Sequence, residues 1–226
     1  MATIYANSND GYVTRFNQST WSDARASTTG TSSNYNTAAH FTGISGYRSS
    51  SRSGGYLFSI YRSFLFFDTA SISTDVDSAT LKIYGYSQAG GDLIAVKSNS
   101  DIETLGTADF GSIVGWDTTT DGSGGGDNES NITKYSSEVS IWSTSGYNNI
   151  TLNAQALADM RDDDTIYICL LNFDNDLKDV APTDFTTNRN GMYYTDQSLT
   201  SKDPYIDYEL AAVETRDNSI FFGTNF

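Results

Sequence analysis

The chain of 226 residues contains a single cysteine, Cys169, and therefore cannot form an internal disulfide. Cys169 lies in the apolar run Thr165–Phe173, so we expect a buried structural thiol rather than a reactive one. The stability of the fold must then come from burial of a core, from a metal or from assembly.

Histidine is equally scarce. His40 is the single histidine, and no Gly-x-Ser-x-Gly motif accompanies it, so a Ser-His-Asp triad is not indicated. A zinc site of the usual kind lacks ligands, and the stretch Gly122–Gly126 does not match a phosphate-binding loop. Acidic pairs are abundant, but none stands out as the acid and base of a glycosidase. We predict no catalytic residue, no cofactor-binding residue and no enzymatic activity.

Basic residues are also few. The 13 lysines and arginines stand against 28 aspartates and glutamates, which gives a formal net charge of −15. Such a chain repels nucleic-acid phosphates and anionic lipid surfaces. No window approaches the roughly 18 apolar residues that a membrane helix needs, and the opening MATIYANSNDGY has no basic or apolar leader segment. We expect no nucleic-acid partner, no membrane partner and synthesis without a signal peptide.

The residues that are abundant favour strands and turns. Aromatic residues make up 13% of the chain, and Ser, Thr, Asn, Asp and Gly fill most of the remainder. Aromatic and β-branched side chains favour strands, whereas Gly, Asn, Asp and Ser favour turns. The composition predicts an all-β fold, an antiparallel jelly-roll β-sandwich with one short helix at about residues 154–161.

The clearest strands are Tyr56–Asp68, which is too apolar for a surface loop, and Ser78–Gln88, which alternates apolar and polar residues. The helix is expected after Asn153, a suitable N-cap. Further short strands are expected at Thr3–Ala6, Tyr12–Thr14, Trp21–Arg25, Phe41–Ile44, Leu93–Ser98, Asn149–Asn153, Thr165–Phe173, Met192–Thr195 and Pro204–Leu210. Residues 28–36 are expected to form a loop. The sandwich should occupy residues 1–212, followed by a C-terminal extended tail, 213–226.

A family resemblance rests on the segment RSFLFFDTASISTDVDSATLKIYGY. It resembles the recurring pattern of DNRLRE-type jelly-roll domains and their relatives near carbohydrate-binding modules, through Arg62, Phe66, Asp68, Ile72, Val76, Ser78, Ala79, Leu81 and Tyr84. The later segment Trp142–Asn153 and the ending Asp203–Tyr208 also match the pattern. The opening residues are similar to small proteins of tailed-phage structural gene clusters. These matches are core and turn positions: Arg62 should pair with a carboxylate or carbonyls, and Asp68 should close a turn.

Candidate ligand-binding residues are aromatic or acidic. Sugar-binding modules stack pyranose rings on exposed aromatic side chains, which makes Trp21 and Trp116 candidates, together with Tyr193 and Tyr194, whereas Trp142 is expected in the core. Calcium prefers hard oxygen ligands, and the acidic groups that could supply them are Asp174, Asp176 and Asp179, and separately Asp162, Asp163 and Asp164. Solvated acidic turns are the alternative for both groups.

The tail holds the residues Ile220, Phe221, Phe222 and Phe226, which we expect to pack on the domain itself or to anchor it to a partner. The resemblance implies a virion structural protein of a tailed bacteriophage, a capsid decoration or fibre-like or tail-appended subunit on the particle surface. Its partners would be other virion proteins and further copies of itself, with a trimer preferred. The alternative function is a carbohydrate-binding module that recognises host or surface glycans, with calcium as an accompanying ion. The acidic interval Asp101–Glu129 stays unexplained.

Overall fold

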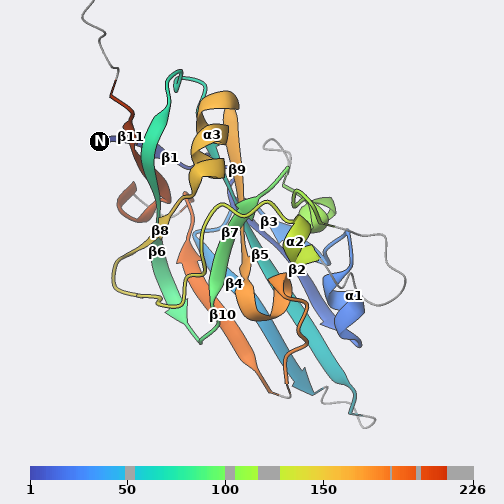
Figure 1. The fold of residues 1–226 in the computed structure, drawn as a ribbon. Helices are drawn as coiled ribbons and strands as arrows, with labels where there is room; N and C mark the ends of the chain where they lie inside the picture. The colour runs from blue at the N-terminus through green and yellow to red at the C-terminus, as the bar shows by residue number, and fades with distance from the viewer. Residues whose placement is uncertain (49–53, 100–104, 117–127, 184, 197–199, 213–226) are drawn as a thin grey trace, which may run out of the picture.

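The protein is described by a computed structural model for residues 1–48, 54–99, 105–116, 128–183, 185–196 and 200–212 (Figure 1). Strands dominate this part of the chain. They are β1 (Ala2–Tyr5), β2 (Gly11–Gln18), β3 (Ser32–Asn34), β4 (Ala39–Arg48), β5 (Tyr56–Asp68), β6 (Val76–Gln88), β7 (Leu93–Lys97), β8 (Tyr147–Thr151), β9 (Thr165–Asn172), β10 (Thr187–Tyr193) and β11 (Tyr205–Leu210).

Helical segments are short. They are α1 (Trp21–Arg25), α2 (Asn128–Asn131), α3 (Ala154–Asp162) and the single turns η1 (Thr107–Gly111), η2 (Phe173–Leu177) and η3 (Thr200–Lys202). The expected helix is confirmed as α3, and the side chain of Asn153 caps it by accepting a hydrogen bond from the Ala156 N–H at 3.1 Å. None of the described helices has the length and apolarity needed to cross a membrane.

Neighbouring strands pair antiparallel in the order β1-β11-β6-β10-β4-β5-β2-β3. Strand β8 pairs with β6, and β9 joins β5 to β7. Figure 1 shows β1, β11, β6 and β8 side by side in one part of the molecule, with α3 next to them. The predicted all-β antiparallel sandwich with one short helix is confirmed.

The central strand β5 is buried on both faces. Leu65 and Phe67 enter one hydrophobic cluster, which also holds Leu81 and Ile83 of β6. Phe64 belongs to a second cluster on the opposite face, beneath α1 and η1. Burial on both faces explains the nearly continuous apolar sequence of β5, and each fully buried large side chain contributes about 1.5–3 kcal/mol.

Strand β6, in contrast, is buried on one face only. Leu81 and Ile83 are fully buried, whereas Tyr84 and Tyr86 alternate with them and point away from the core. Apolar and polar residues alternate in the sequence of β6 because one face of the strand packs on the core and the other faces outward. The outer face of β6 and its neighbours carries the candidate site.

Three expectations about local structure were wrong. Residues Trp21–Arg25 form α1 instead of a strand, because the Thr20 side chain accepts from the Asp23 N–H at 3.0 Å and so begins a helix. The expected loop 28–36 contains the short strand β3. The third concerns β4, which is longer than the expected segment 41–44, and β10, which begins at Thr187 and ends at Tyr193, within the expected segment 192–195.

Candidate functional site

A buried ion pair lies beneath η1 and η2. The Arg62 guanidinium donates from Nε to Asp176 Oδ2 at 2.8 Å and from Nη2 to Asp176 Oδ1 at 2.7 Å, and both side chains are fully buried. Its third donor, Nη1, reaches the Phe110 carbonyl at 2.5 Å. The expected structural role of Arg62 is therefore confirmed, since this bidentate geometry joins the central strand to two distant turns.

Several predicted ligand-binding residues gather around this ion pair. Arg25 donates to the Asp176 carbonyl at 2.6 Å and lies 3.5 Å from Asp179, whose carboxylate accepts the Trp21 indole N–H at 2.7 Å. The Trp116 ring lies under both guanidinium groups, 4.1 Å from Arg62 and 4.6 Å from Arg25. Trp116 is 9% exposed, so this ring does not offer a free face to a sugar.

The calcium candidates do not form one site. The Asp176 carboxylate accepts hydrogen bonds from Arg62, and the Asp179 carboxylate accepts one from Trp21. Asp174 lies at the surface, where its carboxylate is 3.4 Å from the Lys178 ammonium. Within the described residues, the carboxylates close enough to share one cation are instead those of Asp92, Glu138 and Asp174. A hydrogen bond with Asp92 raises the pKa of the Glu138 carboxyl, with a smaller effect of burial.

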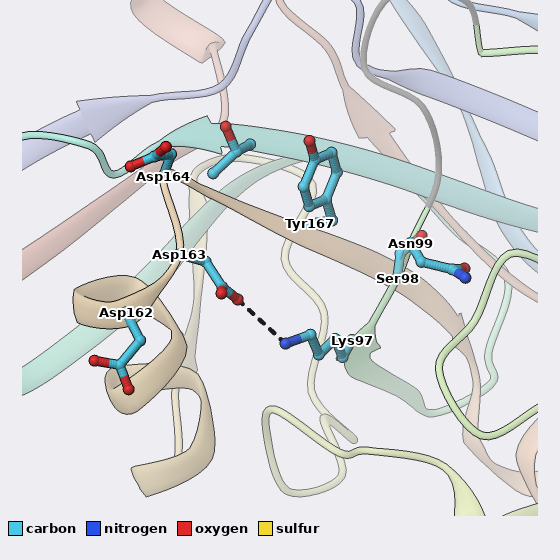
Figure 2. Close-up of a pocket in the computed structure, with 8 residues that line it drawn as sticks. Lys97, Ser98, Asn99, Asp162, Asp163, Asp164 and Tyr167 are labelled. Carbon is cyan, nitrogen blue, oxygen red and sulfur yellow. Dashed lines mark hydrogen bonds and ion pairs between the residues drawn. The ribbon is translucent and has the colours of Figure 1, made fainter.

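The second acidic group, Asp162, Asp163 and Asp164, borders an open pocket of about 770 Å³ at the end of α3 (Figure 2). Its three carboxylates point in different directions in Figure 2. Lys97 donates to Asp163 at 3.2 Å and to Asp159 at 3.0 Å. These contacts tie α3 to β7, and they leave the group without the convergent oxygen atoms of a calcium site.

Seven aromatic side chains form a continuous row across the outer face of the sandwich, which we call the aromatic strip. The centroids of consecutive rings lie between 4.9 and 6.0 Å apart, mostly in edge-to-face contact. The strip runs, in spatial order, through Tyr5 of β1, Tyr205 of β11, Tyr147 of β8, Tyr84 of β6, Tyr193 of β10, Tyr86 of β6 and Phe41 of β4.

The strand register builds this strip. Tyr5 lies directly opposite Tyr205, and Tyr84 lies directly opposite Tyr147, so that each pair shares one face. Exposure is largest toward the two ends, 54% at Tyr5 and 47% at Tyr86, and the rings between them are half-buried. The result is a long aromatic surface on paired strands, partly exposed to solvent in the middle and most exposed at Tyr5 and Tyr86.

Backbone geometry and hydrogen bonds hold individual rings in place. An ideal Cβ on Gly191 would lie 2.6 Å from Cδ1 of Tyr86, so that the glycine gives this ring room to lie over β10. The Tyr147 hydroxyl donates to the carbonyls of Ser201 and Asp203 at 3.0 and 3.2 Å. Burial raises the pKa of Tyr147 to about 12, so its phenol stays neutral at physiological pH.

Basic side chains accompany the rings. The Lys202 ammonium lies 4.0 Å from the Tyr193 centroid and 5.2 Å from that of Tyr84. The Arg189 guanidinium lies 4.1 Å from the Phe41 centroid. Such cation–π contacts fix the cations over the strip, and rings with hydroxyl edges and fixed cations suit a ligand that combines flat apolar faces with polar groups.

Sequence reasoning found only part of this surface. Tyr193 was named, whereas its neighbour Tyr194 is fully buried and hydrogen-bonds Ser63 at 2.5 Å. Tyr84 was interpreted as a fold position alone. The alternation in β6 was the available signal, because it places Tyr84 and Tyr86 on the face opposite Leu81 and Ile83. The predicted anchoring residues Ile220, Phe221, Phe222 and Phe226 lie outside the described residues.

No protein-family model matches the chain, and a search of curated proteins also found no match.

Proposed function

We propose that the chain is a non-enzymatic structural protein on the surface of a tailed-phage particle, and that its aromatic strip binds glycans there. The observation that carries the proposal is the strip itself, seven adjoining rings on one rigid face. Aromatic rings offer a flat apolar surface and, as tyrosines, a polar edge, which matches the two faces of a pyranose ring. Several rings in a row suit an extended ligand.

Display on a particle is supported by charge and by the position of the described chain ends. A net charge of −15 keeps a surface soluble and disfavours contact with nucleic acid or anionic membranes. Strand β1 pairs with β11, so the first and last described residues lie at the same edge of the sandwich. A body held at one edge projects its other surfaces outward.

The attachment segment in this proposal is the C-terminal tail, through Ile220, Phe221, Phe222 and Phe226. Aromatic insertion or strand addition into a neighbouring virion protein would hold it. Many copies on a symmetric particle, as trimers in this proposal, make weak individual contacts sufficient through avidity. Deleting residues 213–226 should abolish incorporation into particles, and unchanged incorporation would contradict the anchor.

Glycan binding is tested with the intact protein on a glycan array, with calcium present and with calcium removed. The informative variant is Tyr84→Ala with Tyr147→Ala, because these rings lie in the middle of the strip. The matched control is Tyr35→Ala, since Tyr35 is 47% exposed and outside the strip. Loss of at least about tenfold in affinity is expected, as for central aromatic anchors. An array without hits would contradict the glycan function.

Particle display has its own test. Antibodies raised against the sandwich should label purified intact particles in electron micrographs, and the chain should be found by mass spectrometry in the same particles. Labelling only after particles are broken open, or absence of the chain from purified particles, would contradict display on the surface. These outcomes do not depend on whether any glycan binds.

A further inference from the structure

We infer that the ligand of the aromatic strip is an acidic polysaccharide, one whose sugar rings carry carboxylate or sulfate groups. The inference rests on the proposed glycan-binding function and deepens it by naming the class of glycan. It follows from where the unpaired cations of this acidic protein lie.

Most described lysines and arginines are already paired with carboxylates. The paired cations are Arg25, Arg62, Lys97, Lys134, Arg161 and Lys178. Among basic side chains that the structure describes, those without such a pair are Arg15, Lys82, Arg189 and Lys202. Acidic residues are more than twice as numerous as basic ones, so the place of these four cations among the described residues is informative.

Three of these four cations lie beside the rings of the aromatic strip. Lys202 and Arg189 lie over its rings. Lys82 stands two residues before Tyr84 on the outer face of β6, directly opposite Asn149, whose side-chain oxygen accepts from the ammonium at 3.0 Å. The fourth cation, Arg15, is elsewhere and donates to the carbonyls of Asp23 and Thr29.

The cations are therefore distributed along the strip. Lys202 sits above Tyr84 and Tyr193, Lys82 flanks Tyr84 on the β8 side, and Arg189 stands at the Phe41 end. A ligand following the rings would meet these positive charges between Tyr84 and Phe41, whereas the carboxylates of Asp203 and Asp207 act on Tyr147 and Tyr205 toward the other end. Local charge complementarity of this kind favours an anionic partner at the strip, although the net charge of −15 repels a polyanion from the rest of the surface.

The combination of rings and cations distinguishes between classes of ligand. A neutral glycan would contact the rings and could accept hydrogen bonds from the three cations, but it would bring no negative charge to them. An acidic peptide would use the cations, but it would not supply a flat ring at each aromatic side chain. An acidic polysaccharide supplies both in every repeating unit, and either a carboxylate or a sulfate would satisfy a lysine or arginine.

The test compares matched polymers with the full chain by isothermal titration calorimetry. Polygalacturonate is set against its methyl ester, which removes the carboxylate charge, and dextran sulfate against dextran. Polyglutamate provides the acidic peptide. We expect binding to polygalacturonate or dextran sulfate, weakened by added salt, with much weaker binding to the uncharged counterparts and to polyglutamate.

Charge variants locate the contact. The double variant Lys82→Gln with Lys202→Gln should weaken binding of the acidic polysaccharide by about tenfold, since each exposed charge contact contributes up to about 1 kcal/mol. Arg189→Gln removes the cation at the Phe41 end and should also weaken binding. Lys134→Gln, which removes a cation paired with Glu129, is the matched control. Melting temperatures confirm that the variants are folded.

The outcomes separate this inference from the proposed function. Equal binding of acidic and neutral polymers, lost with the Tyr84 and Tyr147 changes but kept without Lys82 and Lys202, would overturn the inference and leave glycan binding intact. Binding to polyglutamate as tight as to polygalacturonate would also overturn it. Failure to bind polygalacturonate and dextran sulfate, with hits among neutral glycans on the array, would overturn the inference alone, and failure on the array as well would contradict both.

Discussion

Arg62 and Asp176 form two parallel hydrogen bonds, of 2.8 and 2.7 Å, in a fully buried part of the molecule. The two residues are 114 positions apart in the sequence. Their contact joins the central strand β5 to the turn η2, with the rings of Phe110 and Trp116 on the guanidinium. It therefore fixes the interior, and the ligand-binding surface has to be sought elsewhere.

Breaking this ion pair should destabilise the protein strongly. In Asp176→Asn the buried guanidinium of Arg62 loses its compensating charge, and removing one partner of a buried pair costs about 3–5 kcal/mol. Urea unfolding followed by circular dichroism measures the change. Asp174→Asn, in the same turn but at the surface, is the control and should cost less than about 1 kcal/mol. Equal effects of the two changes would contradict the structural role of Asp176.

A methyl group at Gly191 should disturb the aromatic strip more than the fold. The added Cβ of Gly191→Ala would meet Tyr86 at 2.6 Å and Ser87 at 3.0 Å, so that the Tyr86 ring has to move. We expect weaker glycan binding with a small change in melting temperature. Gly146→Ala is the control, because an added Cβ there meets nothing within 4 Å. Unchanged binding by Gly191→Ala would show that the position of Tyr86 is irrelevant.

Asp10 should make stability depend on pH. Burial raises the pKa of its carboxyl to about 8, although hydrogen bonds from Thr195 oppose the shift. The folded state then binds the proton more tightly than the unfolded state, whose pKa is near 3.8. The free energy of unfolding therefore falls as pH rises from about 4 to 8, by about 1.4 kcal/mol for each pH unit, and levels off above that range.

The variant Asp10→Asn cannot ionise and should lose this part of the pH dependence. Its melting temperature should exceed that of the unmodified protein at pH 8 and differ little at pH 4. Asp77→Asn, which removes an exposed carboxylate, corrects for the change in net charge. If the advantage of Asp10→Asn is the same at both pH values, the pKa of the Asp10 carboxyl is not raised in the folded state.

The parts of the fold that sequence reasoning predicted are those whose signal is local. The apolar run of β5 follows from burial on both of its faces. The alternation of apolar and polar residues in β6 follows from burial on one face only. The helix α3 follows from its N-cap Asn153 and its apolar spacing. The five-residue helix α1 was missed because its beginning depends on one hydrogen bond accepted by Thr20. The composition of this segment favours a strand and gives no sign of that hydrogen bond.

The site was harder to predict because it is assembled from distant segments. The aromatic strip draws its rings from six strands, between Tyr5 and Tyr205 in the sequence. Trp21 and Trp116 were chosen by residue type, yet their surroundings include Arg25, which no local pattern connects to Trp116. Residue type indicates that aromatic side chains can bind sugars, but only the sheet register shows which of them face solvent together.

The most direct test of the central claim is an NMR titration of the full chain, with labelled tyrosine rings, against oligogalacturonate. The account predicts shifts concentrated on the strip tyrosines, above all Tyr84, Tyr147 and Tyr193, while the buried Tyr135 and Tyr194 stay unchanged. Saturable shifts of these rings, absent from the Tyr84→Ala, Tyr147→Ala variant, would identify the strip as the binding surface. Shifts centred on other residues, or none at saturating ligand, would contradict the account.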